Sequence, residues 1–353
     1  MPQFELVPSR LPLRRGLAPG MQRIGLLTEV PGLLRQFGVR PASVLRKVAL
    51  TADALADREA RVPYASIVSL LAECARATGC EHFGLLVGSR WRLEHLGLPG
   101  EIARRSATVG LAIEAFTTWH WMNTTGGVAF LNRAGATTEF GYAIFEPGSA
   151  DGTFQLYDLV VAIVVGMMRQ LGDNADWKPL GVQLSHARPV DVGPYRRYFR
   201  APLRFDAVAS LIQFPSSLEK LPVRSADEAG RREVEARLSA LGSEDLLPRL
   251  YRMVRVAMLF GLTSGDEVAA AMGLGRRTFN RRLEAFGTTF RDALEAVRFE
   301  AARQLLRDTD LAIGEISAAL GYSESSPFVR AFKRWSGHSP MAWRLRMKPP
   351  RAR

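Results

Sequence analysis

Apolar residues recur at helical spacing in the first third of the chain. Residues 44–55, 66–77 and 109–119 carry apolar side chains three or four positions apart, a spacing typical of helices with one buried face. Proline and glycine residues interrupt the pattern between these segments, so each segment is predicted to form a separate helix. Residues 24–115 are therefore expected to be mostly helical.

A strand pattern begins near residue 127. Residues 127–132 and 137–145 flank a short connection that contains Gly135, which predicts a β-hairpin. Further elements are predicted after the hairpin, as helices at 153–171 and 192–199 and as strands at 182–185 and 207–214. Helices mixed with antiparallel strands predict one α+β domain over residues 21–215.

A charged segment follows this domain. Residues 225–241 are rich in Asp, Glu and Arg around a narrow apolar stripe of Val234, Leu238 and Leu241. A helix with such a stripe suits an exposed position. Residues 216–245 are therefore predicted to be a linker with a charged helix, which is a candidate contact in a homodimer.

An internal repeat organises the C-terminal residues. Residues 267–273 (EVAAAMG) align with residues 315–321 (EISAALG) at an offset of 48, and after one added residue the match resumes at an offset of 49. Each copy predicts a short helix, a turn at glycine, which tolerates positive φ, and a second helix with an apolar stripe. A helix-turn-helix has this order of elements. The alternative is a helical repeat without DNA contacts.

A long amphipathic segment separates the two copies. Residues 289–307 carry apolar side chains at helical spacing, and a helix of this length would measure about 28 Å. The major groove returns to the same face of B-DNA after about 34 Å. One rigid helix could therefore hold two recognition helices in successive segments of the groove. The predicted fold is an α+β domain followed by an all-α domain, residues 246–346, with two helix-turn-helix units joined by a long helix.

Polar and basic residues on each second helix lie off the apolar stripe. They are Arg276, Arg277, Thr278, Asn280 and Arg281 in the first copy, and Ser325, Ser326, Val329, Arg330, Lys333 and Arg334 in the second. Such side chains bind phosphates, and arginine and asparagine also read base edges through paired hydrogen bonds. Double-stranded promoter DNA is therefore the predicted partner of this domain.

The charge of the chain favours the same kind of partner. The net charge is +12, and residues 261–353 hold 16 Lys and Arg against 10 Asp and Glu, so half of the excess lies in about a quarter of the length. A basic module is drawn to the phosphate backbone and releases counterions on binding. Charge alone leaves open a basic face that is merely well solvated.

Residues 246–346 resemble the DNA-binding domain of AraC/XylS-type regulators. The resemblance rests on residues 312–323 (AIGEISAALGYS) and 328–340 (FVRAFKRWSGHSP), which carry most of the C-terminal signature of that family. It implies a set of base-reading residues: Arg277, Asn280 and Arg281 in the first recognition helix, and Ser325, Ser326 and Arg330 in the second.

Two residues depart from the family pattern. Gly275 stands where the family has a serine cap, a change that costs only about a few tenths of a kcal/mol. Pro327 would lie inside the first turn of the second recognition helix if that helix began at the usual place. We therefore expect the helix to begin at Ser325. This shift moves Ser325 and Ser326 relative to the groove and leaves Arg330 as the firmer base-reading residue.

The larger domain resembles a sensor domain of one branch of AraC-type regulators, including the ornithine-utilisation type. The resemblance involves residues 109–121, 180–189 and 194–215. It implies an effector-binding domain without naming the effector. The candidate effector residues are Trp119, His120, Trp121 and His186, because ligand pockets combine aromatic rings with a few polar groups. Core packing is the alternative for each of them.

Enzymatic functions find no support in the sequence. The GxSxG, HExxH, Walker and GxGxxG-plus-acid motifs are absent. An Ada-like DNA-repair methyltransferase is an alternative with a similar DNA-binding module, but Cys74 and Cys80 are too few for its four-thiolate zinc site. We predict that both cysteines are core residues and that the chain uses no metal or cofactor.

The chain ends and the apolar content bear on location. Residues 1–20 lack the apolar core of a signal peptide and are predicted to be a disordered lead-in, and residues 347–353 to be a basic tail. The longest apolar run, residues 159–168, is too short to cross a bilayer. A cytoplasmic location without a membrane partner is therefore expected.

The combined prediction is a bacterial transcription regulator controlled by a small-molecule effector. The resemblance implies that it is an activator that contacts RNA polymerase. A ligand-independent DNA-binding protein is the remaining alternative, and the size of the first domain argues against it.

Overall fold

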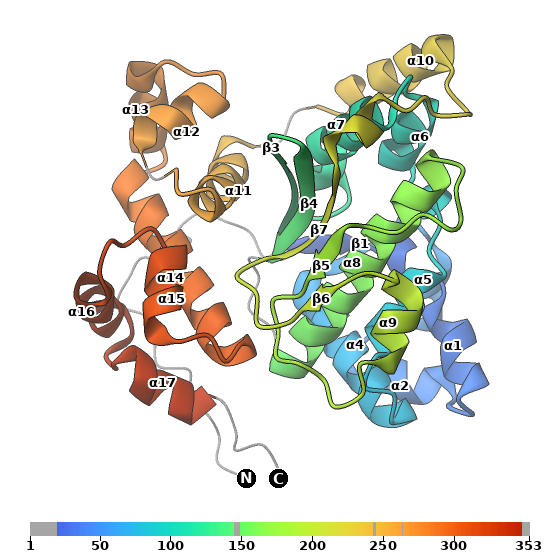
Figure 1. Cartoon of the computed structure of the whole chain (residues 1–353), viewed down its shortest axis with the longest axis horizontal. Coiled ribbons are helices and arrows are strands. Elements are labelled where there is room, and N and C mark those ends of the chain that lie inside the picture. Colours follow the sequence, from blue (N-terminus) through green and yellow to red (C-terminus); the bar gives the residue numbers. More distant parts are fainter. Residues whose placement is uncertain (1–19, 145–148, 243–244, 263, 348–353) are drawn as a thin grey trace. The chain divides into compact units, whose positions relative to one another are not determined.

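The computed structural model describes residues 20–144, 149–242, 245–262 and 264–347. These residues divide between two compact units, one within residues 19–244 and the other within residues 245–353 (Figure 1). The predicted lead-in and basic tail lie outside the described residues, apart from Gly20 and Met347.

The described residues of the first unit contain a sheet of five strands in the order β3-β4-β7-β5-β6. Its strands are β3 (Gly127–Ala134), β4 (Thr137–Ile144), β5 (Gly181–Gln183), β6 (Leu203–Arg204) and β7 (Ser210–Pro215). The predicted hairpin is β3-β4, where Ala134 pairs with Thr137 and Gly135 takes a φ of 63°. All neighbours are antiparallel except β5 and β6. The α+β prediction is thus confirmed.

Three short strands were not predicted. They are β6 and the pair β1 (Met21–Arg23) and β2 (Arg61–Pro63), which form a separate two-stranded sheet. Strands of two or three residues are too short to show an alternating pattern, so sequence periodicity could not reveal them.

Helix α8 (Ala150–Leu171) is the main core helix of the first unit. Ser149 caps it by accepting a hydrogen bond from the backbone N–H of Gly152. The helix packs against α4 (Tyr64–Thr78), α5 (Phe83–Ser89) and strands β4 and β7. It is long and apolar enough to cross a membrane, but 72% of its most apolar window is buried inside the protein. Burial of this kind is typical of the core helix of a soluble protein.

Two glycines allow α5 to approach α8 closely. A Cβ atom at Gly84 would lie 1.9 Å from the backbone oxygen of Gln155, and one at Gly88 would lie 2.3 Å from that of Leu159. Both obstructing atoms belong to the backbone, so a larger residue at either position must push the helices apart. The packing of α5 on α8 thus depends on the missing side chains.

We expect Gly88→Ala to lower the free energy of unfolding by about 1–3 kcal/mol, the usual cost of overpacking. Urea denaturation of the full chain measures this loss. Gly32→Ala is the matched control, because Gly32 is exposed in helix α1 (Val30–Gln36) and a Cβ there meets nothing within 4 Å. An equal loss in the two variants would contradict the close-approach explanation.

The remaining helices of the first unit surround this core. They include α2 (Pro41–Lys47), α3 (Ala52–Ala56), α6 (Leu98–Arg105), α7 (Val109–Trp119) and α9 (Gly193–Phe199). The predicted helices at 66–77, 109–119 and 192–199 are confirmed. The single helix predicted at 44–55 is wrong. Ala49 has a φ of 54°, and the side chain of Thr51 caps α3 as a new helix.

Both cysteines lie in the core, as predicted. Cys74 and Cys80 are buried and form no disulfide. Burial raises the pKa of the Cys74 thiol to about 12, so this group stays protonated at neutral pH. A buried protonated thiol behaves as a small apolar side chain.

Helix α10 (Glu228–Ala240) is the predicted charged helix, but it is not an exposed linker. Val234 and Leu238 are buried against Ile102 of α6. Arg105 donates a hydrogen bond of 2.6 Å to the carboxylate of Asp227 at the start of α10. Residues 216–242 therefore belong to the first unit. The apolar stripe is narrow, but α6 offers a matching apolar face that sequence spacing does not show.

The second unit is helical throughout its described residues. Its helices are α11 (Leu246–Leu259), α12 (Gly265–Ala271), α13 (Arg276–Ala285), α14 (Phe290–Asp308), α15 (Ile313–Ala319), α16 (Ser325–Ser336) and α17 (Pro340–Met347). Helix α14 joins the pair α12–α13 to the pair α15–α16. In the two turns, Gly273 and Gly321 take φ values of 70° and 75°. The two predicted helix-turn-helix units and the long helix are confirmed.

Candidate nucleic-acid interface

Helix α13 presents its polar side away from the core of the second unit. Phe279 and Leu283 are its buried residues. Arg281 follows Phe279 by two positions, which is about 200° around a helix, so it lies opposite the buried side. The helix begins after Gly275, which contributes no side-chain cap, as the sequence predicts.

The five candidate residues of α13 differ in exposure and in the direction of their side chains. Arg277, Asn280 and Arg281 are exposed, whereas Thr278 is half-buried. Arg276 turns back toward its own unit, with its guanidinium carbon 5.8 Å from the ring centre of Phe290. Arg277, Asn280 and Arg281 are therefore the best placed to contact a ligand outside the unit.

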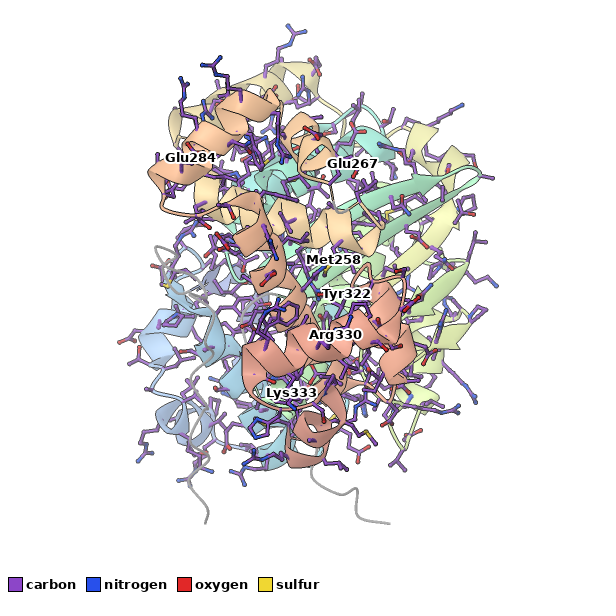
Figure 2. All side chains as sticks on the ribbon, turned by 90° about the vertical axis from the view of Figure 1, so that its left-hand side faces the viewer. Met258, Glu267, Glu284, Tyr322, Arg330 and Lys333 are labelled. Atoms are coloured by element: carbon purple, nitrogen blue, oxygen red, sulfur yellow. The ribbon has the colours of Figure 1, made fainter. Side chains whose placement is uncertain are left out.

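Helix α16 begins at Ser325, as expected from Pro327. Proline is tolerated there because the first-turn N–H groups of a helix have no partner within the helix. Phe328 and Trp335 are buried, and Arg330 lies about 200° around the helix from Phe328. The exposed candidates on this helix are Ser325, Ser326, Arg330, Lys333 and Arg334. In Figure 2, Glu284 on α13 and Arg330 and Lys333 on α16 lie on the side that faces the viewer.

Two residues of α14, Glu295 and Arg298, position α16. Glu295 accepts a hydrogen bond of 3.1 Å from the indole N–H of Trp335 and forms an ion pair of 3.2 Å with Arg334. Arg298 donates to the backbone oxygen of Leu320 at 2.9 Å. It also lies 4.5 Å from the ring centre of Tyr322. These contacts hold the turn before α16 and one side of α16 against α14.

Sequence reasoning missed Glu295 and Arg298. Both lie on the polar side of the predicted helix 289–307, and their spacing of three places them on one face. The sequence shows that shared face but not the partner that covers it.

Four of the six candidate cations on the two recognition helices have no carboxylate partner among the residues that the structure describes. Arg277, Arg281, Arg330 and Lys333 form no ion pair among the residues that the structure describes, whereas several arginines elsewhere in the unit do, for example Arg303 with Glu300 at 3.2 Å. An exposed cation without a partner is available to phosphates and base edges without first breaking an ion pair. The charge distribution therefore favours an anionic ligand at α13 and α16.

The four candidate effector residues do not form one site. Trp119 packs against the buried cluster between α6 and α10, and Trp121 is half-buried. His186 is buried elsewhere and lies 3.0 Å from the carboxylate of Asp158. His120 alone among the four lines the enclosed cavity inside the first unit.

Comparison with protein families gives two matches. Residues 38–223 match the arabinose-binding domain of AraC transcription regulator, N-term, and residues 268–346 match a helix-turn-helix domain. The chain is 28% identical to the HTH-type transcriptional regulator VirS of Mycobacterium tuberculosis over 318 residues, which cover 88% of this chain and 93% of VirS. It is 23% identical to the ornithine utilization regulator of Pseudomonas aeruginosa, with the same coverage of 88% and 93%.

A solved structure is also similar. The crystal structure of the transcriptional regulator CdpR from Pseudomonas aeruginosa has a TM-score of 0.39 and 26% sequence identity, and the match covers 74% of this chain and 85% of CdpR. The named relatives are transcription regulators and not enzymes, as the lack of catalytic motifs in the sequence predicts.

Proposed function

Because the chain belongs to the AraC family of transcription regulators, we propose that it reads promoter DNA with α13 and α16 under the control of a small-molecule effector. It is a helix-turn-helix DNA-binding regulator of transcription. The proposal that these helices read DNA rests on the four candidate cations, Arg277, Arg281, Arg330 and Lys333, that form no ion pair among the described residues. Their exposure leaves them free to enter a groove.

Base reading and phosphate binding divide among the candidate residues. The proposed base readers are Arg277, Asn280 and Arg281 on α13 and Ser325, Ser326 and Arg330 on α16. Arg276, Thr278, Lys333 and Arg334 are proposed phosphate contacts, which fix orientation without reading sequence. Arginine forks pair with guanine and asparagine amides with adenine, so both helices carry groups that can discriminate bases.

The first unit is proposed to bind the effector and to pass its effect on through α10. This helix is the last element of the first unit before α11, and it packs on α6 through Val234 and Leu238. An effector changes DNA binding only if it has different affinities for two states of the protein. We further propose a cytoplasmic activator that contacts RNA polymerase and acts as a homodimer.

Selection of genomic fragments by the full chain tests the DNA-reading proposal. The bound fragments are sequenced after selection at about 150 mM salt, where non-specific binding is weakened. The expected result is a motif with two short elements about one helical turn, or ~10 base pairs, apart. Recovery of fragments without a shared motif would contradict reading by α13 and α16.

Lys333→Ala should weaken binding to all DNA sequences alike. If Lys333 binds a phosphate, its removal should reduce the slope of log affinity against log salt by about 1. Affinities for the selected site and for a random duplex are measured by fluorescence anisotropy at several salt concentrations. Lys220→Ala removes the same charge from an exposed position of the first unit and should leave the slope unchanged. An unchanged slope in Lys333→Ala would exclude the phosphate contact.

A further inference from the structure

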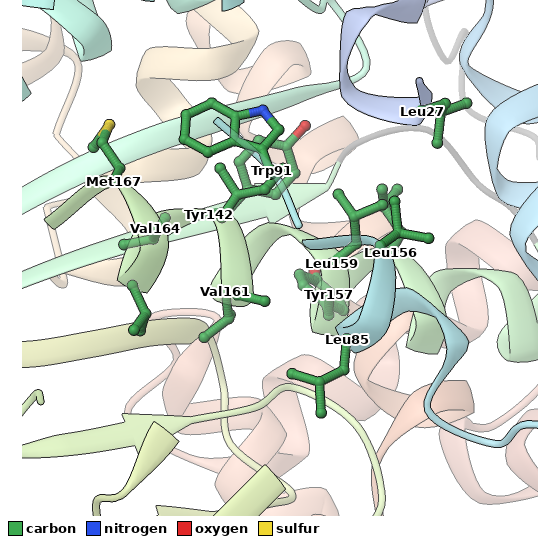
Figure 3. Packing of buried hydrophobic residues seen from close by; sticks show 14 of the residues in the cluster. Leu27, Leu85, Trp91, Tyr142, Leu156, Tyr157, Leu159, Val161, Val164 and Met167 are labelled. Carbon is green, nitrogen blue, oxygen red and sulfur yellow. The ribbon is translucent and has the colours of Figure 1, made fainter. Parts of the chain in front are cut away.

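The first unit encloses a cavity of about 50 Å³ beside α7 and α8. Its apolar lining includes Phe116, Leu156, Val160 and Val164. Figure 3 shows Leu156 and Val164 on α8, with Tyr142 on β4. An apolar enclosure with a few polar groups is the usual form of a small-molecule site.

Asn123 brings a buried amide group to this cavity. The side chain of Asn123 is 4% exposed, and its amide nitrogen has no hydrogen-bond partner among the described residues. The backbone fixes the position of Asn123, because its oxygen accepts from Arg23 at 2.8 Å and its N–H donates to His120 at 2.9 Å. An unsatisfied buried amide costs about 1–3 kcal/mol, so a ligand that accepts this hydrogen bond gains more than it would from water-exposed groups.

The one charged side chain among Asp, Glu, Lys and Arg that lines the cavity, Arg23, is already paired with Glu59. The lining includes Arg23 but no Asp, Glu or Lys. Arg23 donates from Nε to Glu59 at 2.8 Å and from a terminal nitrogen to the backbone oxygen of His95 at 2.5 Å. Burial lowers the pKa of His95, which favours its neutral form. A cation would find no counter-charge here, and an anion would find only an arginine that is already paired.

We infer that this cavity is the effector site and that it takes a small uncharged molecule, mostly apolar, with one oxygen that accepts a hydrogen bond from Asn123. The inference rests on the proposed function in so far as it calls the ligand an effector. It adds the chemical class of that ligand.

The wall of the cavity offers a way in. The segment η2 (Leu93–Leu96) lines the cavity with His95 and Leu96, and it lines an open surface groove with Leu93 and Glu94. The pair Arg23–Glu59 also lies between the two spaces, since Arg23 lines the cavity and Glu59 lines the groove. The Glu59 side chain is 73% exposed but that of Arg23 only 7%, so an opening at this point has to keep the buried guanidinium paired or hydrated. A displaced η2 would join the cavity to the groove and enlarge it.

The same groove reaches the end of the first unit. Arg237 of α10 and Ser225, which precedes α10, line it together with η2. A ligand that displaces η2 therefore changes the surroundings of the helix that leads into α11. This gives the effector a physical route to the DNA-binding unit.

Thermal unfolding of the full chain tests the ligand class with four probes of one size. They are cyclopentanone, cyclopentane, cyclopentanecarboxylate and cyclopentylammonium. At a given concentration, a ligand of the native state raises the melting temperature more the more tightly it binds. Cyclopentanone should raise it most, cyclopentane less, and the two ions not at all. Equal shifts with the ions, or no shift with any probe, would overturn the inference.

Two variants localise the binding. Asn123→Leu should weaken cyclopentanone binding by about tenfold, the worth of one buried hydrogen bond, and should leave the cyclopentane response in place. Asn174→Leu, at an exposed position, is the control. Ala129 lines the cavity, so Ala129→Val should fill it and abolish both responses even if Asn123→Leu folds poorly. Full responses in Ala129→Val would place the binding elsewhere.

DNA affinity is measured separately for the same proteins. If a probe binds but DNA affinity stays unchanged, the cavity is a ligand site without a regulatory role. Loss of the selected DNA motif would reject the DNA-reading proposal and leave the thermal result intact. The two failures are therefore distinguishable.

Discussion

Replacing Arg281 and Arg330 together by alanine should lower affinity for the selected DNA site by about 2–6 kcal/mol, because each base-reading arginine is worth about 1–3 kcal/mol. The two residues lie at matching places in the repeat, two positions after Phe279 and Phe328. They are on separate recognition helices, so their contributions should add. Neither is held in an ion pair among the described residues, and no such bond offsets the gain from a guanine contact.

Fluorescence anisotropy with the selected duplex and with a random duplex measures this effect. Affinity for the random duplex should fall far less, because non-specific binding depends on phosphates. Lys220→Ala combined with Arg224→Ala removes the same two charges from exposed positions of the first unit and should preserve the difference between the duplexes. If the Arg281/Arg330 variant lost affinity equally on both duplexes, the two arginines would be phosphate contacts instead.

Phe332→Ala should lower the free energy of unfolding of the second unit by about 3–5 kcal/mol, as is usual for the truncation of a buried phenylalanine. The Phe332 side chain is fully buried. Its ring centre lies 5.6 Å from that of Phe299 on α14 and 6.0 Å from that of Trp343 on α17. The residue therefore joins three helices, and its loss leaves a cavity at their junction.

Urea denaturation measures the loss, with Phe332→Leu as the matched variant. Leucine keeps most of the buried volume and should cost less than half as much. A domain has a total stability of about 5–15 kcal/mol, so Phe332→Ala should also reduce DNA binding through the unfolded fraction. A loss below about 1 kcal/mol would mean that the neighbouring helices close the cavity.

The C-terminal unit could be predicted from sequence because its determinants are local. Gly273 and Gly321 set the turns, and the apolar stripes that follow them set the buried sides of α13 and α16. Pro327 moved the predicted start of α16 to Ser325, where the structure has it. Each of these features acts within a few residues of its own position, so a single sequence contains it.

Non-local contacts account for what the sequence did not predict. The sequence predicts an exposed apolar stripe on α10, but Ile102 of α6 covers it in the structure. Ala49 takes a positive φ without any residue type that favours it. The contacts of Glu295 and Arg298 depend on α16 and its turn folding back onto α14. None of these has a pattern within its own segment.

The candidate effector cluster shows the same limit. Trp119 and His120 are adjacent in sequence, but successive residues of a helical segment point about 100° apart. Trp119 consequently packs toward α10, while His120 lines the cavity. Asn123, the residue on which the ligand inference depends, follows the cluster by two positions. No sequence pattern marks it, because its significance lies in a side-chain amide that has no hydrogen-bond partner among the described residues.

The two recognition helices are anchored unequally. Phe279 and Leu283 are the buried residues of α13, whereas α16 buries five, among them Phe328 and Trp335. Fewer buried contacts lower the free energy of local opening, so α13 should fluctuate away from its native position more often than α16. A promoter that has a good half-site only for α16 would then be bound weakly. Each improvement of its half-site for α13 would raise the fraction of promoter that is bound. Unequal anchoring would thus give graded promoter strengths from one protein.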